Sequence, residues 1–161
     1  MSAILRPDER MVMPMTVVEI DAVAAIEAAA YPFPWTRGNF IDSLAAGYPA
    51  RVLLGERHRI VGYFVAMQGV DAMHLLNLTV APSEQSRGHG RYLLDQLVAL
   101  CRERRARQLW LEVRLSNARA RALYVRYGFR QIGVRRGYYP APLGRREDAA
   151  VMSLEVGDAL D

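Results

Sequence analysis

The sequence predicts a mixed α/β fold in which helices lie on the faces of one β-sheet. Short runs with the alternation of strands are separated by longer runs with helical periodicity. The stretch from His74 to about Arg105 follows the order strand, loop, helix. At 161 residues, with no linker and no internal repeat, the chain is most simply one domain with a sizeable core.

The N-terminal part is expected to begin with a flexible leader over residues 1–13, and a single domain is expected over residues 14–161. A first strand is expected at Met15–Val18. Asp21 can cap a helix that runs through Ala30, because its carboxylate can accept from free N–H groups of the first turn. The inward residues of this helix are expected to be Val23, Ile26 and Ala30.

An aromatic segment follows this helix. Tyr31-Pro32-Phe33-Pro34-Trp35 must leave the helical state, because each proline disfavours helix in the residue before it. The segment is either a plug in the core or a wall of a substrate site. Thr36 can then cap a second helix, Arg37–Ala46.

Six further strands follow from short apolar or alternating runs. They are expected at Ala50–Glu56, Ile60–Gln68, His74–Val80, Gln108–Arg114, Phe129–Val134 and Ala149–Glu155. In the fourth of these strands, alternation places Trp110, Glu112 and Arg114 on one face. Tyr138-Tyr139-Pro140 is expected in the loop between the last two strands.

Two helices complete the predicted elements. One follows Gly90 and runs to about Arg105, with an apolar face made of Leu93, Leu94, Leu97, Val98 and Cys101. The other is capped by Ser116 and runs to about Tyr127, where Gly128 would end it in the left-handed conformation.

The loop Gln85–Gly90 is a candidate anion site. A glycine-containing loop that enters a helix exposes unpaired backbone N–H groups and the positive end of the helix dipole, which suits a phosphate or pyrophosphate. The loop lacks the Gly-Lys-Ser/Thr of a Walker loop and the third small residue of a dinucleotide fingerprint, since Leu93 stands there. A plain strand-to-helix turn is the alternative.

Composition excludes several classes of protein. The formal net charge is +4, carried mostly by arginine, which favours anionic ligands but gives no sign of direct nucleic-acid binding. Cys101 is the only cysteine, so an internal disulfide or a cysteine zinc cluster is impossible, and the three histidines lack metal-ligand spacing. We expect no metal and, without a signal sequence or a membrane-length apolar run, a cytoplasmic protein.

A set of spaced motifs resembles the GCN5-related N-acetyltransferase (GNAT) superfamily. The motifs are Gln85-x-x-Gly-x-Gly90, Leu-Trp-Leu-Glu-Val-Arg at 109–114, Ser-Asn at 116–117, Ala-Leu-Tyr at 122–124 and Tyr-Gly-Phe at 127–129. Arg-Arg-Gly-Tyr-Tyr-Pro at 135–140, with Glu-Asp-Ala behind it, looks like the RimI type. That type acetylates the N-terminal alanine of a small-subunit ribosomal protein. The resemblance covers roughly residues 16–155.

The resemblance implies the GNAT fold, which is a mixed, mostly antiparallel sheet of about seven strands, splayed at the cofactor site and flanked by about four helices. It also implies acetyl-CoA as co-substrate, whose pyrophosphate matches the ligand expected at the loop. By the resemblance, the cofactor-binding residues are Leu78, Thr79, Val80, Ser86, Arg87, Gly88, His89, Gly90, Arg91 and Asn117. Asn117 could instead use its amide only to start the following helix. The His89 side chain is not expected to be a ligand.

The resemblance assigns Glu112 as general base and Tyr124 as general acid. An α-amino group has a pKa of roughly 7.7–8.0, so its deprotonation at neutral pH costs only about a kcal/mol and a modest base suffices, directly or through water. An apolar strand would raise the pKa of Glu112. Alternatively, Glu112 is a surface carboxylate paired with an arginine. Tyr124 could instead be an aromatic residue of the core, although Leu123 is expected to fill the adjacent inward position.

The substrate would be a peptide N-terminus. Tyr138 and Tyr139 would bind the peptide backbone, with Phe33 and Trp35 as an opposite wall; packing of a hairpin is the alternative for the tyrosines. We expect a monomer or weak dimer that needs neither nucleic acid nor membrane. Two other functions stay open at this stage: an acetyltransferase of a small amine or a lysine side chain, and a non-catalytic acyl-CoA-binding or ribosome-associated module. An acetylation assay with an Ala-starting peptide and polyamines separates all three.

Overall fold

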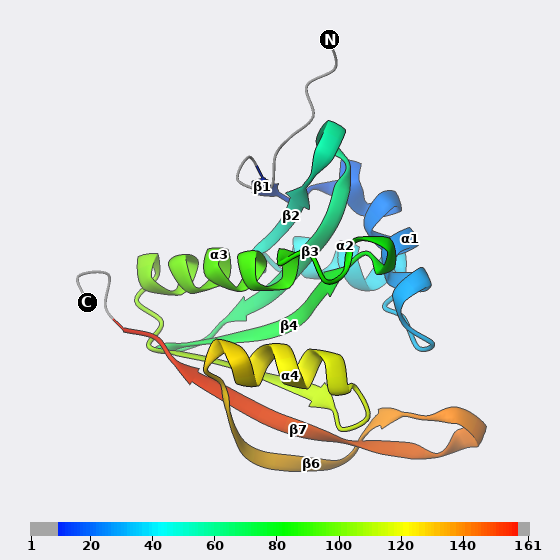
Figure 1. The fold of residues 1–161 in the computed structure, drawn as a ribbon, viewed down its shortest axis with the longest axis vertical. Helices are drawn as coiled ribbons and strands as arrows, with labels where there is room; N and C mark the ends of the chain where they lie inside the picture. Colours follow the sequence, from blue (N-terminus) through cyan, green and yellow to red (C-terminus); the bar gives the residue numbers. More distant parts are fainter. Residues whose placement is uncertain (1–9, 158–161) are drawn as a thin grey trace. The chain divides into compact units, whose positions relative to one another are not determined.

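The computed structural model describes residues 10–157 of the chain, which contain seven strands and four α-helices (Figure 1). The strands are β1 (Met11–Pro14), β2 (Ala50–Leu54), β3 (Ile60–Gln68), β4 (Ala72–Val80), β5 (Gln108–Arg114), β6 (Arg130–Pro140) and β7 (Arg146–Glu155). The helices are α1 (Ile20–Ala30), α2 (Arg37–Ala45), α3 (His89–Glu103) and α4 (Ala118–Tyr127).

Hydrogen bonding orders the strands as β1-β2-β3-β4-β5-β7-β6. The pairs β1–β2, β2–β3, β5–β7 and β6–β7 are antiparallel, whereas β4 and β5 are parallel. Their parallel pairing runs from Ala72 opposite Gln108 to Leu75 opposite Leu111, and both strands continue beyond it. The mixed, mostly antiparallel sheet with about four helices is confirmed.

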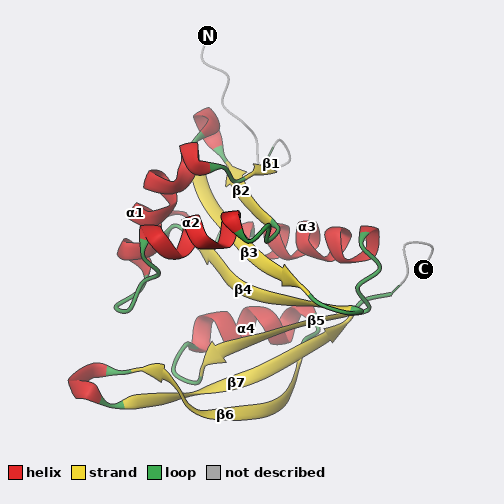
Figure 2. Ribbon diagram, turned by 180° about the vertical axis from the view of Figure 1, so that it is seen from behind, coloured by secondary structure: helices red, strands yellow, loops and turns green. Residues whose placement is uncertain are grey.

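The described chain falls into two compact units. The first contains residues 10–67 and 77–96, and the second contains residues 68–76 and 97–157. β4 and α3 each pass from one unit to the other. In the first unit, α1 and α2 cover one face of β2 and β3, and the start of α3 covers the other (Figures 1 and 2). In the second unit, α4 lies against one face of β5 and β7 (Figures 1 and 2).

Local signals placed several elements correctly. Thr36 accepts from the Asn39 N–H at 3.1 Å, the Asn39 side chain accepts from the Thr36 N–H at 2.9 Å, and this capping box starts α2. Gly128 ends α4 with a φ of 123°, a conformation that favours glycine. The predicted apolar face of α3 is buried throughout: Leu93, Leu94, Leu97, Val98 and Cys101 are at most 7% exposed.

The N-terminal prediction was wrong in two places. The first strand is Met11–Pro14, so residues 11–13 of the expected leader pair with β2, while residues 1–9 lie outside the described part. Residues 17–19 form a 3-10 turn with a Thr16–Glu19 capping box, and α1 begins at Ile20. Asp21 therefore lies inside the helix and does not cap it.

The inward face of α1 also differs from the prediction. Its buried residues are Ile20, Val23 and Glu27, whereas Ile26 and Ala30 are only half-buried. A carboxylate thus occupies a core position, and its partners belong to the candidate site described below.

The predicted loop around Tyr138-Tyr139-Pro140 is part of a strand. β6 extends to Pro140, and its pairing with β7 jumps from Arg135 opposite Ala149 to Tyr139 opposite Glu147. Four residues of β6 therefore correspond to two residues of β7, which is a β-bulge. Gly137, with a φ of 58°, supplies the left-handed residue within it.

Candidate functional site

The loop that precedes α3 has the properties of an anion site. Ser86 and Gly88 have positive φ values of 64° and 79°, which turn the chain sharply into the helix. Ser86, Arg87 and Gly88 are exposed, as is Arg91 in the first turn of α3. The first N–H groups of a helix have no partner within it and carry the positive end of its dipole. Exposed N–H groups and two arginines together suit a diphosphate.

His89 contributes to this loop through its backbone. Its side chain is 9% exposed, and Nδ1 lies 3.3 Å from Nη1 of Arg10. The Arg10 guanidinium also lies over the Tyr92 ring at 4.4 Å, and the Tyr92 hydroxyl donates to the Arg10 carbonyl. Burial lowers the pKa of His89, and the Arg10 charge lowers it further, so the imidazole is neutral. This packing agrees with the expectation that the side chain is not a ligand.

The first unit also contains a buried polar network around Glu27. The Glu27 side chain is 2% exposed. Oε1 accepts from the Tyr63 hydroxyl at 2.6 Å and from Asn77 Nδ2 at 3.0 Å, and Oε2 accepts from the Trp35 N–H at 3.0 Å. One carboxylate therefore joins α1, β3, the C-terminal half of β4 and the segment before α2. Glu27 was not among the residues predicted for the site.

The same network fixes the predicted cofactor segment Leu78–Val80. The Thr79 hydroxyl donates to Asn77 Oδ1 at 2.7 Å and lies 2.8 Å from the Tyr31 hydroxyl. Thr79 is 2% exposed, whereas Leu78 and Val80 are half-buried. The side chain of Thr79 is thus used inside the protein, so that a ligand at this segment would meet mainly its backbone.

The aromatic residues of the segment before α2 differ in burial. The half-buried ring of Trp35 packs against Phe40, with 5.2 Å between the ring centroids, and Phe40 is fully buried. Phe33 is 40% exposed. Trp35 therefore belongs mostly to the core, and Phe33 is the residue that can form a wall.

In the second unit, Glu112 is held at both carboxylate oxygens. Its side chain is 5% exposed. Oε1 lies 2.5 Å from Nε2 of His74 on the neighbouring strand β4, and Oε2 accepts from Arg135 Nη1 at 2.9 Å. The face of β5 that carries Trp110 and Glu112 is the one predicted from the alternation, since Leu109, Leu111 and Val113 are buried on the other face.

The expected upward shift of the Glu112 pKa is wrong. Burial raises the pKa, but the hydrogen bond and charge of His74, together with the charge of Arg135, outweigh it, and the pKa lies below its ordinary value. The carboxylate is consequently ionised at neutral pH. The alternative of a surface carboxylate is half right, because Glu112 does pair with an arginine but is not exposed.

Asn117 and Tyr124 both lie on α4. Asn117, not the predicted Ser116, is the N-cap, and its Oδ1 accepts from the Ala120 N–H at 3.2 Å. Tyr124 is the buried residue of this helix at 6% exposure, and its ring meets that of Phe129 edge-on at 5.3 Å. Leu123 is only half-buried, so the expectation that it fills the inward position is wrong.

The predicted peptide-binding tyrosines lie on the bulge of β6, close to Glu112. Their rings meet at 4.9 Å and 78°; Tyr138 is 40% exposed, whereas Tyr139 is half-buried. The Arg135 guanidinium, which donates to Glu112, also lies over the Tyr138 ring at 5.1 Å. Burial and the Glu112 charge raise the pKa of Tyr139, which therefore keeps its proton. Glu112, Tyr138 and Tyr139 thus form one cluster.

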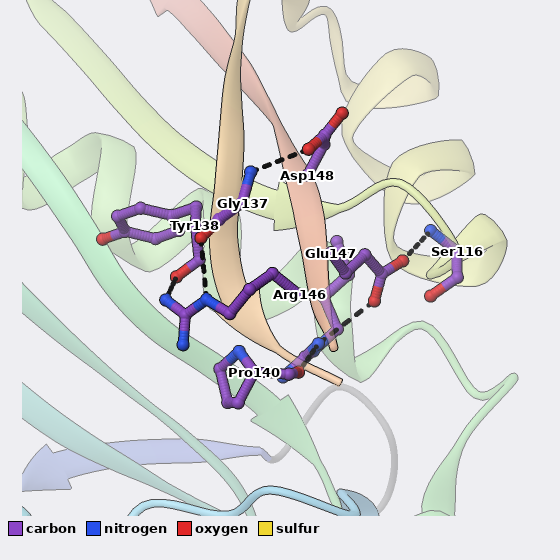
Figure 3. Close-up of polar contacts among 8 residues, drawn as sticks. Ser116, Gly137, Tyr138, Pro140, Arg146, Glu147 and Asp148 are labelled. Carbon is purple, nitrogen blue, oxygen red and sulfur yellow. Dashed lines mark hydrogen bonds and ion pairs between the residues drawn. The ribbon is translucent and has the colours of Figure 1, made fainter. Parts of the chain in front are cut away.

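Side chains of β7 hold the bulge in shape (Figure 3). Asp148 accepts from the Gly137 N–H at 2.7 Å, and Arg146 donates to the carbonyls of Gly137 and Tyr138. Glu147 accepts from Arg114 and from the Ser116 N–H, which ties the same hairpin to the start of α4. Asp148 and Arg146 therefore shape the backbone around the tyrosines, whereas Glu147 connects the hairpin to α4.

Sequence reasoning missed three residues: Glu27 in the first unit, and His74 and Arg135 in the second. A carboxylate at a helical core position was a visible signal for Glu27, because buried charges are almost always paired. His74 and Arg135 reach Glu112 only through the strand order, with β4 beside β5, and no spacing along the chain indicates that order.

None of the helices in the described part of the chain has the length and apolar character that crossing a membrane requires. No group of three or more histidine, cysteine, aspartate or glutamate side chains in that part is arranged to hold a metal ion.

Comparison with known proteins identifies the family. Residues 20–129 match the model of the acetyltransferase (GNAT) family. A ribosomal protein bS18-alanine N-acetyltransferase of Haemophilus ducreyi is 38% identical over 141 residues, which cover 86% of this chain and 97% of that protein. The Escherichia coli K12 protein of the same name is 35% identical over 142 residues, covering 88% and 95%.

The fold agrees with this assignment. The crystal structure of the ribosomal-protein-S18-alanine N-acetyltransferase from Escherichia coli matches with a TM-score of 0.84 and 34% identity, covering 93% of this chain and 96% of that one. The sequence match, the fold match and the seven-stranded mixed sheet agree with one another. The chain is therefore an enzyme of the GNAT acetyltransferase family.

Proposed function

We propose that the protein transfers the acetyl group of acetyl-CoA to the α-amino group of an N-terminal alanine of a small-subunit ribosomal protein. The observation that carries this proposal is the match, over nearly their full length, to relatives named as alanine N-acetyltransferases of ribosomal protein bS18. A ribosomal substrate would be met in the cytoplasm, and we propose that the protein acts there as a monomer or weak dimer.

Acetyl-CoA fits the residues of the first unit. The N–H groups of Ser86, Arg87, Gly88, His89 and Gly90, with the Arg91 side chain, would hold its diphosphate. The exposed loop, its two positive φ values and its arginines support this role. The backbone of Leu78, Thr79 and Val80 would contact the pantetheine arm and could polarise the thioester carbonyl as oxyanion-type donors do.

Asn117 and Tyr124 of the second unit would also meet the coenzyme. Oδ1 of Asn117 is used in capping α4, so we assign the contact with the arm to its Nδ2 group. Tyr124 would donate its proton to the departing thiolate. A phenol with an ordinary pKa near 10 can protonate a thiolate whose conjugate thiol has a pKa near 8.5 when the two are in contact.

Glu112 would act on the incoming amine. With an α-amino pKa of roughly 8, about one amine in ten is already neutral at pH 7, so a strong base is not required. The ionised, fixed carboxylate would bind the ammonium form and accept its proton, directly or through a water. Its lowered pKa makes the carboxylate a weaker base than the sequence suggested, so the reaction would rely on the fraction of the amine that is already neutral.

The atoms balance as follows. The amine nitrogen forms a bond to the thioester carbonyl carbon, and the carbon–sulfur bond breaks. Starting from the ammonium form, the nitrogen gives one proton to Glu112 before the attack and a second to water as the new bond forms. The sulfur gains a proton from Tyr124, which water then reprotonates, and Glu112 releases its proton to water. The products are the N-acetylated peptide and free coenzyme A.

The peptide would lie against the bulge of β6. Tyr138 and Tyr139 stand beside Glu112, which supports their assignment to the peptide backbone next to the reacting amine. Phe33 would form an opposite wall, with Trp35 behind it in the core.

The test is to incubate the protein with acetyl-CoA and a panel containing Ala-starting peptides, peptides with other first residues, a lysine peptide blocked at its N-terminus, and polyamines. Mass spectrometry of the products locates the acetyl group. The proposal predicts α-amino acetylation of the Ala-starting peptides above all others. Preferred acetylation of lysine or polyamines, or no transfer to any amine, would contradict it.

A further inference from the structure

His74 is placed to control Glu112. It lies on β4 opposite Trp110 of β5, and its ring stacks on the indole with 3.6 Å between centroids and 6° between planes. Because side chains two residues apart on a strand share a face, the ring that covers Trp110 also reaches Glu112. The resulting contact joins Nε2 of His74 to Oε1 of Glu112 at 2.5 Å.

This contact is largely screened from water. The His74 side chain is 11% exposed and that of Glu112 is 5% exposed, whereas the other partner of the carboxylate, Arg135, is 52% exposed. An interaction between groups away from solvent is screened less than one at the surface. Of the two groups on the carboxylate, His74 is therefore the one whose effect water weakens least.

The charged and titratable groups that face the carboxylate come from two strands besides its own. They are His74 from β4, and Arg135 and Tyr139 from β6. The β7 residue opposite Glu112 is Val151, which is apolar. Tyr139 keeps its proton, so the ionisation of Glu112 is set by burial on one side and by His74 and Arg135 on the other.

We propose that His74 is a positioning residue for the acetyl transfer: by donating from Nε2 to Oε1, it fixes the Glu112 carboxylate and keeps it ionised for the incoming amine. This inference rests on the proposed function for the role of Glu112, but the contact itself concerns two residues of one unit. Trp110 contributes to this positioning, because stacking on its indole holds the His74 imidazole in the plane in which Nε2 points at the Glu112 carboxylate.

The proposal predicts the direction in which the pKa of Glu112 changes when His74 is replaced. An N–H donor stabilises the ionised carboxylate and so lowers its pKa. Replacing His74 by leucine leaves burial and Arg135 in place but removes that donor, so the pKa of Glu112 must rise. The acidic limb of kcat/KM, where Glu112 becomes protonated, then moves to higher pH, while the plateau at higher pH is retained. Loss of fold alone would lower the plateau without moving the limb.

The experiment compares wild type with His74→Leu, His74→Gln and His58→Gln. Glutamine keeps a neutral N–H donor, and His58 is an exposed histidine in the turn after β2 that has no part in the site. The Glu112 carboxyl is titrated by carbon NMR, with its signal assigned from Glu112→Gln, and kcat/KM for an Ala-starting peptide is measured over the same pH range. The titration needs no activity.

The expected result is a higher Glu112 pKa and a matching shift of the acidic limb in His74→Leu, partial return in His74→Gln, and wild-type behaviour in His58→Gln. An unchanged Glu112 titration in His74→Leu overturns the inference, whatever happens to the rate. If wild type acetylates no peptide, the proposed function fails, while the NMR titration still decides whether His74 controls the carboxylate.

Discussion

Replacing Glu27 by glutamine tests the buried polar network that this carboxylate forms in the first unit. The substitution keeps the size of the side chain but leaves only one acceptor oxygen, whereas the carboxylate accepts from Tyr63, Asn77 and the Trp35 N–H. If the amide oxygen faces Tyr63 and Asn77, its NH2 group faces the Trp35 N–H, and two buried donors lack an acceptor. The opposite orientation leaves Tyr63 and Asn77 facing a donor.

The size of the effect follows from these contacts. Leaving a buried donor unsatisfied costs about 1–3 kcal/mol, so two such donors cost roughly 2–6 kcal/mol of unfolding free energy. In a chain of this length each kcal/mol lowers Tm by about 2–4 °C, which gives a decrease of roughly 4–24 °C. Differential scanning calorimetry and urea unfolding measure both quantities.

Asp21→Asn is the matched control. It makes the same carboxylate-to-amide change on the same helix, but the Asp21 side chain is 82% exposed and its partner Arg37 is 57% exposed. An exposed ion pair contributes about 0–1 kcal/mol, so this variant should stay within about 4 °C of wild type. If Glu27→Gln melts no lower than Asp21→Asn, the network does not stabilise the unit as argued.

Three further outcomes are expected. Tyr124→Phe should lower kcat by the roughly 10²–10⁴-fold typical of a lost general acid, with little change in acetyl-CoA affinity by calorimetry; near wild-type turnover would remove Tyr124 from the mechanism. Gly62→Ala would place a Cβ 2.8 Å from the Thr79 carbonyl oxygen, so it should lower the unfolding free energy in a urea melt by about 1–3 kcal/mol and raise the KM for acetyl-CoA. Gly133→Ala, whose added Cβ would have no atom within 4 Å, is the control. Equal kinetics in the two variants would contradict the role of Leu78–Val80 in binding the coenzyme. Burial raises the pKa of the Cys101 thiol to about 11, so a thiol reagent at about pH 8 should label it only after unfolding, and fast labelling of the folded protein would show that the α3 face is open.

The parts of the fold that could be predicted from the sequence depend on local interactions. The capping box at Thr36, the left-handed Gly128 and the apolar face of α3 each involve residues a few positions apart, so their spacing is visible along the chain. β3 was predicted with its observed bounds, Ile60–Gln68, because a turn or a polar stretch marks each end.

The parts that could not be predicted depend on contacts between distant residues. Met11–Pro14 is a strand because β2 pairs with it, and Tyr138 lies on a bulge because Asp148 and Arg146 hold its neighbours. The same reason explains the error at Glu112. An upward shift was expected because Glu112 stands in an apolar strand, but the groups that reverse the effect of burial on its pKa come from β4 and β6.

The role of the resemblance was to assign chemistry to residues that the local pattern left open. The side chain of Asn117 caps α4, as expected if it only starts that helix. Tyr124 is likewise buried, as an aromatic residue of the core would be. For both residues, contact with the coenzyme must be measured in its presence.

The most direct measurement is therefore a crystal structure of the protein with acetyl-CoA bound. The account predicts the diphosphate against the backbone N–H groups of Ser86–Gly90, and the Tyr124 hydroxyl within hydrogen-bonding distance of the thioester sulfur. A coenzyme bound away from that loop, or a sulfur atom out of reach of Tyr124, would contradict it.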